Sequence, residues 1–387
     1  LAAGSNPLAV DVHLVVVLHG SHTASTVARY PWSWIPKPPP KGAFLKVRQM
    51  TVLASLVFVA ACGTLEEGSL DAEQNCIVGS AVTGRPVRVV STVAPITSLI
   101  AQIVGDSGAQ VTGLVPEGTN SHTFEPPPSA AQVLESADVV FMNGLVLEEP
   151  TKDLAQANVG DGTVLCELGT QILPKEEWVF DFSFPEEGGK PNPHLWTNPP
   201  MAKSYAEIIR DVLSQLDPSN ASAFESNYAA LASIIDDLDA AMKRATETIS
   251  SDRRLLLTYH DAYAYFAKHY NWTVVGAIQP SSFDEPTPKD VAELVAQVRE
   301  REVPAVFGSE VFPSSVLEQI GNETGARYID VLRDDDLPGK PGDADHSWQA
   351  LMRFNFVTMV EALGGDATSL KSLDMSLRSA DRAEYPQ

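Results

Sequence analysis

The chain has 387 residues, enough for two domains that each bury a core of ordinary size. Its 44% hydrophobic and 20% charged residues are typical of a globular protein and exclude a disordered or membrane-spanning one. A formal net charge of −23 argues against a nucleic-acid binder, because phosphate recognition requires clustered Lys and Arg. The acidity keeps a protein soluble, and it also raises the concentration of cations near its surface. Charge alone does not separate these two roles.

Residues 1–61 are expected to be a leader that lies outside the fold. Lys41, Lys46 and Arg48 precede an apolar run at residues 52–61, which ends in small residues just before Cys62. This order is typical of a secretory signal. The run is too short for a helix that crosses a bilayer about 30 Å thick. Signals rarely start far ahead of their apolar run, so we expect Met50 to be the true start of the protein.

The end of this leader, Val59-Ala60-Ala61-Cys62, resembles the lipobox of bacterial lipoproteins. The resemblance implies that Cys62 is lipidated and anchors the chain to the outer face of the bacterial cell membrane. Several acyl chains on one residue give a durable anchor, whereas a single chain is marginal. A plain secreted protein that is cut nearby is the alternative.

Two cysteines, Cys76 and Cys166, remain for the mature chain. Outside the cytoplasm such a pair can form a disulfide. Their distance in space does not follow from the sequence, so a disulfide and two free thiols both stay open. Neither cysteine belongs to a metal-binding cluster of the CxxC type.

Residues 62–86 are rich in Gly, Glu and Ser and are interpreted as a tether. Strands then alternate with helices through a predicted N-terminal lobe at residues 87–216. Its strands are expected at residues 87–91, 109–115, 139–143 and 163–168, and its helices at residues 96–104 and 130–136. This alternation predicts an α/β fold with a mostly parallel sheet covered by helices on both faces.

One long helix is predicted at residues 217–250. Asp217-Pro218 suits a helix start, and apolar residues from Phe224 to Ile249 recur at steps of three or four. About 30 residues of helix would be roughly 45 Å long, which is longer than one domain usually needs. We therefore expect this helix to be a rigid connection between two lobes.

The alternation resumes in a predicted C-terminal lobe at residues 251–366. Its strands are expected at residues 255–258, 274–277, 305–308 and 327–331, and its helices at residues 261–269, 288–301, 315–324 and 347–363. Residues 367–387 have no clear apolar stripe and are expected to be a loosely held tail. The predicted architecture is two α/β lobes of mostly parallel sheet flanked by helices and joined by one long rigid helix.

Four histidines share one kind of position in the predicted fold. His122, His194, His260 and His346 each lie in a loop after a strand or at the start of a helix. Ligand sites gather at such positions in open α/β sheets. Dozens of residues separate each histidine from the next, so the spacing fits no local zinc motif and any shared site depends on the fold. His269 falls within a predicted helix, beside aromatic residues, and is not expected to be a ligand.

Four short segments combine histidines, prolines, aromatics and a glutamate in a distinctive way. They are His122-Thr123-Phe124-Glu125-Pro126, Pro193-His194-Leu195-Trp196, His260 to Phe266, and Phe307-Gly308-Ser309-Glu310. Together, over residues 87–365, they resemble the metal-binding loops of the cluster A-I substrate-binding proteins, the zinc and manganese receptors of ABC importers. Each motif alone is modest, whereas the set is specific.

The resemblance implies two lobes joined by a rigid helix, an ion bound in the cleft and an ABC transporter membrane permease as the partner. His122 and His194 of the N-terminal lobe and His260 of the C-terminal lobe would be ligands. The family usually has an aspartate in the fourth place, nine residues before an asparagine of the closing helix. Counting back from Asn355 places His346 there.

Asp345 lies beside His346 and is the alternative fourth ligand, because a shift of one residue restores the carboxylate. The carboxylates of Glu125 and Glu310 are expected to accept hydrogen bonds from the free ring nitrogens of ligating histidines. A loop carboxylate that faces water is an equal alternative for Glu125.

The ligand types favour zinc over manganese. Manganese prefers oxygen ligands, and the family's manganese receptors commonly carry a carboxylate where this chain has His260. Three or four imidazoles suit zinc. The preference for zinc therefore depends mainly on this one residue.

The predicted function is that of a monomeric, extracytoplasmic, lipid-anchored receptor that captures Zn²⁺ between two lobes and delivers it to an ABC importer. A manganese or iron receptor of the same family and a surface adhesin are the alternatives. A zinc hydrolase or lyase is disfavoured, because four protein ligands leave no open position for a reacting water. No catalytic residues are expected.

Overall fold

The computed structural model describes residues 75–284, 286–309, 315–376 and 383–385. All of them fall within one compact unit, residues 66–387. The predicted leader at residues 1–61, the lipidation site Cys62, most of the tether and Glu310 lie outside the described residues. Within the described ranges, no helix is both long and apolar enough to cross a membrane.

The N-terminal lobe is built on a four-stranded parallel sheet with the strand order β2-β1-β3-β4. The strands are β1 (Arg88–Ser91), β2 (Gln110–Gly113), β3 (Val139–Met142) and β4 (Val164–Glu167). All four residues of β3 are buried, as expected for a central strand that helices cover on both faces. Strand order reverses between β1 and β3, and loops at the carboxyl ends of such strands form a crevice.

The C-terminal lobe repeats this arrangement with the order β6-β5-β7-β8, and its strands are also parallel. The strands are β5 (Leu255–Thr258), β6 (Thr273–Ala277), β7 (Ala305–Ser309) and β8 (Arg327–Leu332). Two parallel sheets flanked by helices confirm the predicted α/β fold with two lobes.

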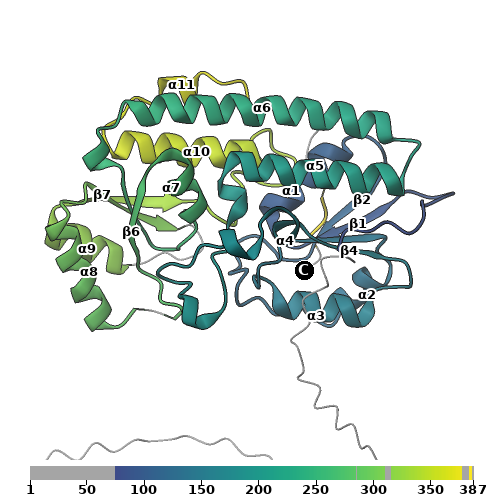
Figure 1. Ribbon diagram of the computed structural model, residues 1–387, viewed down its shortest axis with the longest axis horizontal. Helices are drawn as coiled ribbons and strands as arrows, with labels where there is room; N and C mark the ends of the chain where they lie inside the picture. The colour runs from purple at the N-terminus through teal and green to yellow at the C-terminus, as the bar shows by residue number, and fades with distance from the viewer. Residues whose placement is uncertain (1–74, 285, 310–314, 377–382, 386–387) are drawn as a thin grey trace, which may run out of the picture. The chain divides into compact units, whose positions relative to one another are not determined.

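Eleven helices are described around the two sheets (Figure 1). They are α1 (Ala94–Val104), α2 (Ala130–Glu135), α3 (Glu149–Asn158), α4 (Leu168–Ile172), α5 (Pro199–Leu216), α6 (Ala221–Glu247), α7 (Ala264–Tyr270), α8 (Pro288–Glu300), α9 (Ser315–Thr324), α10 (Trp348–Ala362) and α11 (Thr368–Lys371). The long helix is α6, which packs against α1 and α5 and also against α10 and α11. It therefore contacts helices that belong to both lobes.

The long helix begins later than the sequence suggests. Residues from Asp217 to Asn220 form the turn between α5 and α6, where Asn220 donates to both the backbone carbonyl and the carboxylate of Asp217. With 27 residues, α6 is roughly 40 Å long at about 1.5 Å per residue. Helix α5 ends at Leu216, so Asp217-Pro218 marks the turn rather than the helix start itself.

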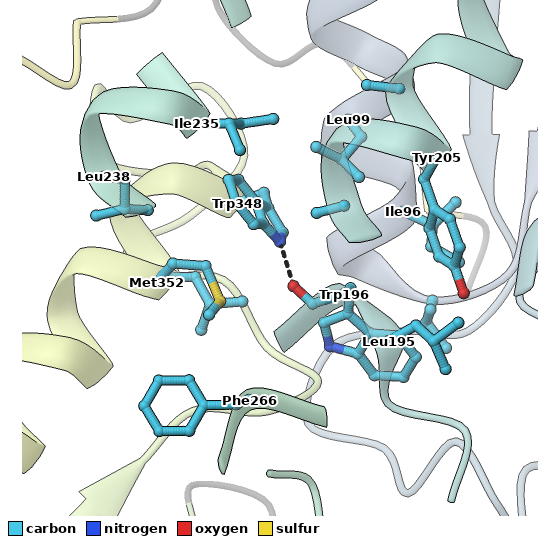
Figure 2. Close-up of a cluster of buried hydrophobic side chains, with 14 of the residues drawn as sticks. Ile96, Leu99, Leu195, Trp196, Tyr205, Ile235, Leu238, Phe266, Trp348 and Met352 are labelled. Carbon is cyan, nitrogen blue, oxygen red and sulfur yellow. Dashed lines mark hydrogen bonds between the residues drawn. The ribbon is translucent and has the colours of Figure 1, made fainter. Parts of the chain in front are cut away.

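One hydrophobic core runs beneath α6 and includes side chains from both lobes (Figure 2). Ile96 and Leu99 of α1 and Tyr205 of α5 meet Ile235 and Leu238 of α6 in this core. From the other side it receives Phe266 of α7 and Trp348 and Met352 of α10. A continuous apolar core makes relative movement of the lobes costly, because any rotation would expose buried surface.

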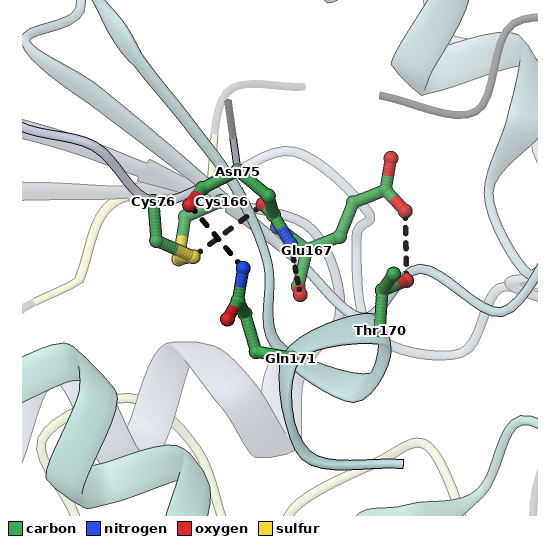
Figure 3. Close-up of a disulfide and its surroundings, with 6 residues drawn as sticks. All are labelled: Asn75, Cys76, Cys166, Glu167, Thr170 and Gln171. Atoms are coloured by element: carbon green, nitrogen blue, oxygen red, sulfur yellow. Dashed lines mark hydrogen bonds between the residues drawn. A yellow bond between two sulfur atoms is a disulfide. The ribbon is translucent and has the colours of Figure 1, made fainter. Parts of the chain in front are cut away.

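A disulfide joins Cys76 to Cys166 of β4, with Cα atoms 4.3 Å apart (Figure 3). Backbone pairing supports it, because the Cys76 amide donates to the Leu165 carbonyl. Asn75 adds a reciprocal pair, since its amide group donates to the Glu167 carbonyl and its oxygen accepts from the Glu167 amide. The structure thus resolves the question that the sequence left open, and the end of the tether is fixed to the edge of the N-terminal sheet.

The described parts of the tail are docked on the fold, in contrast to the expected loose segment. Leu370 and Met375 are buried in the main core. Further along, Glu384 pairs with β2 beside Thr112, and Tyr385 lies against Gly113. Each of these contacts is made by a single residue. The tail therefore packs on the fold although its sequence has no apolar stripe with helical spacing.

We predict that loss of the disulfide lowers the free energy of unfolding by about 2–4 kcal/mol, because the bond closes a long loop in the unfolded chain. The measurement is urea unfolding of the wild type and of the Cys76→Ala/Cys166→Ala variant, each with and without a thiol reductant. Reductant should shift the wild-type midpoint and leave the variant unchanged. A wild-type midpoint that ignores the reductant would contradict the prediction.

Candidate metal centre

Three histidines from both lobes converge on one point. The Nε2 atom of His122 lies 3.2 Å from that of His194 and 3.3 Å from that of His260. The Nε2 atoms of His194 and His260 are 2.9 Å apart. Two nitrogens bound tetrahedrally to one zinc at about 2.0–2.1 Å would be about 3.3 Å apart. The three nitrogens are therefore spaced as ligands of a single ion.

Each of these histidines follows a strand or precedes a helix. His122 lies in the loop after β2, His194 directly precedes the short 3-10 helix Leu195–Thr197, and His260 comes two residues after β5. The carboxyl ends of parallel strands lie on one edge of a sheet, which brings such loops together. The convergence of His122, His194 and His260 agrees with the expectation from the motifs.

Two side-chain amides orient two of the rings. Nδ1 of His194 lies 2.8 Å from Oδ1 of Asn192, and Nδ1 of His260 lies 2.6 Å from Oε1 of Gln279. Because an amide oxygen only accepts, each Nδ1 carries the hydrogen and donates it. The lone pair of each Nε2 is then directed to the common point.

The orienting amides are themselves held in place. Asn192 donates to the carbonyl of Asp261 at 2.8 Å, and the Ser183 hydroxyl donates to the Gln279 carbonyl at 2.6 Å. Both amide side chains are buried. We expected the carboxylates of Glu125 and Glu310 in this orienting role, whereas Glu125 is exposed and Glu310 lies outside the described residues.

Burial controls the charge of the three rings. His194 and His260 are 0% and 2% exposed, and His122 is half-buried. Burial lowers the pKa of His194 and of His122 well below the ordinary value, and neighbouring His260 lowers both further. The charge of Lys190 also lowers the pKa of His122. Burial likewise lowers the pKa of His260. The rings are thus neutral at neutral pH, which is the form that binds a metal.

His346 and Asp345 are not part of this group. The Nδ1 atom of His346 lies 3.2 Å from the Pro338 carbonyl oxygen, and its Nε2 faces Glu117 Oε1 at 3.8 Å. Asp345 is exposed. The count of nine residues back from Asn355 runs along α10 and ends at His346, two residues before that helix begins. It therefore reached a residue at the α10 end of the loop after β8, which faces Pro338 and Glu117 instead of the three histidines.

Asp334 is a carboxylate that lies beside His260 at the candidate metal centre. Its Oδ2 atom is 3.7 Å from Nε2 of His260, and the residue is 2% exposed. The Trp196 indole donates to the Asp334 carbonyl at 2.9 Å. Asn355 holds the preceding residue, because it exchanges hydrogen bonds with the backbone of Arg333. In the sequence, Asp334 belongs to the run Asp334-Asp335-Asp336 that follows β8. The count of nine residues back from Asn355 did not reach this run.

The loop of His122 is joined to the loop of Asp334 by polar contacts. The Ser121 hydroxyl donates to Asp335 at 2.7 Å, and the Gly118 amide donates to Asp336 at 2.7 Å. Burial raises the pKa of Asp335 to about 6. These contacts link the ligand loops of the two lobes directly.

A second pair of acids supports the loop before His194. Burial, together with the neighbouring Asp261, raises the pKa of Asp181 to about 9. Asp261 accepts from the Ser183 amide at 3.0 Å, and Asp181 accepts from Asn192 at 3.1 Å. A proton on this pair at neutral pH allows the two carboxyl groups to stay together.

The family model described as "ZnuA: Zinc-uptake complex component A periplasmic" matches residues 89–362. The manganese-binding lipoprotein MntA of Halalkalibacterium halodurans is 28% identical over 74% of this chain and 91% of its own length. The iron-binding protein YfeA of Yersinia pestis is 28% identical over 80% of this chain and 96% of its own length. The zinc-binding protein TroA of Treponema pallidum is 27% identical over 73% of this chain and 91% of its own length.

Solved structures agree with these relatives. The periplasmic zinc-binding protein TroA of Treponema pallidum aligns with a TM-score of 0.65 and 25% identity, over 72% of this chain and 99% of that one. A manganese-bound periplasmic metal-binding protein of candidatus Liberibacter asiaticus aligns with a TM-score of 0.63 and 27% identity over the same shares. Two parallel sheets, three converging histidines and a family match over most of the sequence agree, and the chain belongs to the ZnuA family of metal-binding receptors of ABC importers.

Proposed function

We propose that this protein captures Zn²⁺ outside the cytoplasm and delivers it to the membrane permease of an ABC importer. The observation that carries the proposal is the convergence of the three Nε2 atoms of His122, His194 and His260 within 2.9–3.3 Å. Two of these neutral imidazoles, His194 and His260, are already oriented by amides and need little rearrangement to bind an ion. Asp334 is proposed as the fourth ligand.

The ligand set favours zinc among the metals for which the relatives are named. Those names include zinc, manganese and iron, so the relatives do not decide between them. Three imidazoles and one carboxylate match the nitrogen-rich tetrahedral sites of zinc, whereas manganese prefers oxygen. Four protein ligands in a buried site also leave no open position for a reacting water, which supports a receptor rather than an enzyme.

The anchor and the partner follow from the same family. Several relatives are named lipoproteins of ABC transporters, and the predicted lipid on Cys62 would tether the receptor beside its permease. The disulfide fixes the end of the tether to β4 and so connects this anchor to the N-terminal lobe. A monomer is sufficient, because both lobes and all four proposed ligands come from one chain.

We predict that the protein binds one Zn²⁺ per chain and that His194→Ala or His260→Ala weakens binding severely. The loss of zinc affinity should exceed the roughly 10–100-fold loss that follows when a residue that only supports a metal ligand is removed. The measurement is competition with a chromophoric zinc chelator. His269→Ala is the matched control, because His269 pairs with Asp239 on α6 and should leave the affinity unchanged. Undiminished binding in both ligand variants would refute the site, and tighter binding of Mn²⁺ would replace zinc with manganese.

The fourth ligand is tested by comparing Asp334→Asn with His346→Gln. We expect Asp334→Asn to weaken zinc binding by about 10-fold or more and to change the visible spectrum of bound Co²⁺, because a carboxylate leaves the coordination shell. His346→Gln should leave the Co²⁺ spectrum unchanged, and so should Asp345→Asn. If only His346→Gln altered the Co²⁺ spectrum, His346 rather than Asp334 would be the fourth ligand.

The pH dependence of stability tests the neutral histidines in the metal-free protein. Because burial lowers the pKa of His194, the unfolded chain binds more protons than the folded one once the pH falls below about 6.5. The stability that the neutral His194 ring contributes is fully present above about pH 6.5 and is lost as the pH falls below that value. His194→Gln should therefore lose less stability than the wild type on acidification. Urea unfolding with a chelator present measures this, and parallel curves for the two proteins would contradict it.

A further inference from the structure

A cavity of about 530 Å³ lies beside His122 at the candidate metal centre. Its walls come from the loop between β3 and α3, from the loop that precedes His194, and from Ser281 and Phe283 after β6. A single metal ion fills only a small fraction of this volume. The size is instead that of pockets that hold small organic molecules.

The walls of this cavity are mainly apolar. Leu147, Phe184 and Pro193 contribute to them, and Phe283 stacks on the His122 ring with centroids 4.5 Å apart. Apolar side chains cannot replace the water shell of a hydrated ion, and desolvation without new ligands is costly. Such walls suit the body of an organic molecule better than they suit an ion alone.

Lys190 adds a positive charge to the same cavity. It is exposed and lines the cavity together with His122. Its positive charge lowers the pKa of the His122 ring. A cation at this place repels a divalent ion bound by His122. Glu149 also lines the cavity, and its carboxylate lies 3.9 Å from Lys152, which makes a closer ion pair with Glu167 at 2.9 Å. Lys190 therefore places a positive charge beside a candidate site for cations. An anion between Lys190 and the bound ion would offset the repulsion between these two positive charges.

The backbone around this cavity is strained at three residues. Leu145, Val146 and Phe283 have positive φ angles of 54°, 64° and 59°. Positive φ is unfavourable for residues other than glycine, and most of all for β-branched Val. The Glu148 carboxylate holds the first segment, because it accepts from the amides of Asn143 and Gly144. Strain maintained by specific hydrogen bonds is typical of ligand-binding segments.

We propose that this cavity binds a small organic carboxylate that accompanies the metal ion. The carboxylate lies between Lys190 and the ion held by His122, and the apolar body of the molecule packs against Phe184 and Phe283. The anion stays outside the coordination shell of the four protein ligands, and its charge offsets the repulsion between Lys190 and the ion. This inference depends on the proposed function, since the anion accompanies a bound ion.

The experiment measures zinc affinity with and without a millimolar organic carboxylate at matched ionic strength. The probes are benzoate, phenylacetate and hydrocinnamate, which share a carboxylate and differ in the reach of the aromatic body. At least one should tighten zinc binding by about 5- to 10-fold. By reciprocity it should bind the zinc-loaded protein more tightly than the zinc-free protein by the same factor.

Lys190→Gln separates the role of the charge from general effects. This variant should bind zinc alone more tightly than the wild type, because the repulsion is removed, and the carboxylate should no longer increase the affinity. Lys203→Gln is the matched control, because Lys203 pairs with Asp236 between α5 and α6 and should retain the carboxylate effect.

Two results would overturn the proposal. One is a wild-type zinc affinity that none of the three carboxylates changes. The other is a Lys190→Gln variant that retains the full carboxylate effect. Failure of the proposed function is distinguishable from both, because zinc would then not bind under any of these conditions.

Discussion

The buried indoles of Trp348 and Trp196 connect the core of the protein to its candidate metal centre. Trp348 donates to the Trp196 carbonyl at 3.0 Å, and Trp196 donates to the Asp334 carbonyl at 2.9 Å. Trp196 lies two residues after His194, so this relay joins a ligand loop of one lobe to a ligand loop of the other. Both indoles are fully buried beneath α6, where each needs a hydrogen-bond partner. The packing of the core thus sets how the loops of His194 and Asp334 lie against each other, and a change in that packing would alter the candidate metal centre.

The buried surroundings of the three histidines disfavour an added proton but favour a divalent metal ion. Burial disfavours a charged imidazolium, which has only its hydrogen bonds to compensate for lost water. A divalent ion at the same place gains three nitrogen ligands and the nearby Asp334 carboxylate, and these replace its water shell. The low dielectric that excludes the proton also strengthens the attraction between the ion and Asp334. A buried, neutral histidine set therefore keeps the site free of protons and ready for a metal.

The sequence predicted the fold class and the three histidines that converge, because both are encoded locally. Alternating strands and helices predict the sheets, and the motifs around His122, His194 and His260 are short. The expected fourth ligand His346 does not join the three histidines, because the count from Asn355 ended just before α10, whereas the proposed fourth ligand Asp334 follows β8 at the other end of the loop. Gln279 had no local signal, since it meets His260 only through the pairing of β5 with β6. Asn192 was closer to prediction, because it lies two residues before His194 and its side chain can accept from that residue's amide. The disulfide depended on a distance across the sheet, which spacing in the sequence does not contain.

The shared core also determines where the site can open. Rotation of one lobe against the other would expose apolar surface along α6, and each buried side chain would add to that cost. Local opening of loops costs far less, because loops have few buried apolar contacts. Of the three histidines, only His122 is partly exposed, and it borders the cavity between the strained Leu145-Val146 segment and Phe283. Movement of these loops would expose His122 and leave the Trp348–Trp196–Asp334 contacts intact. An ion held by the three histidines would then exchange through the cavity beside His122, where Lys190 lies.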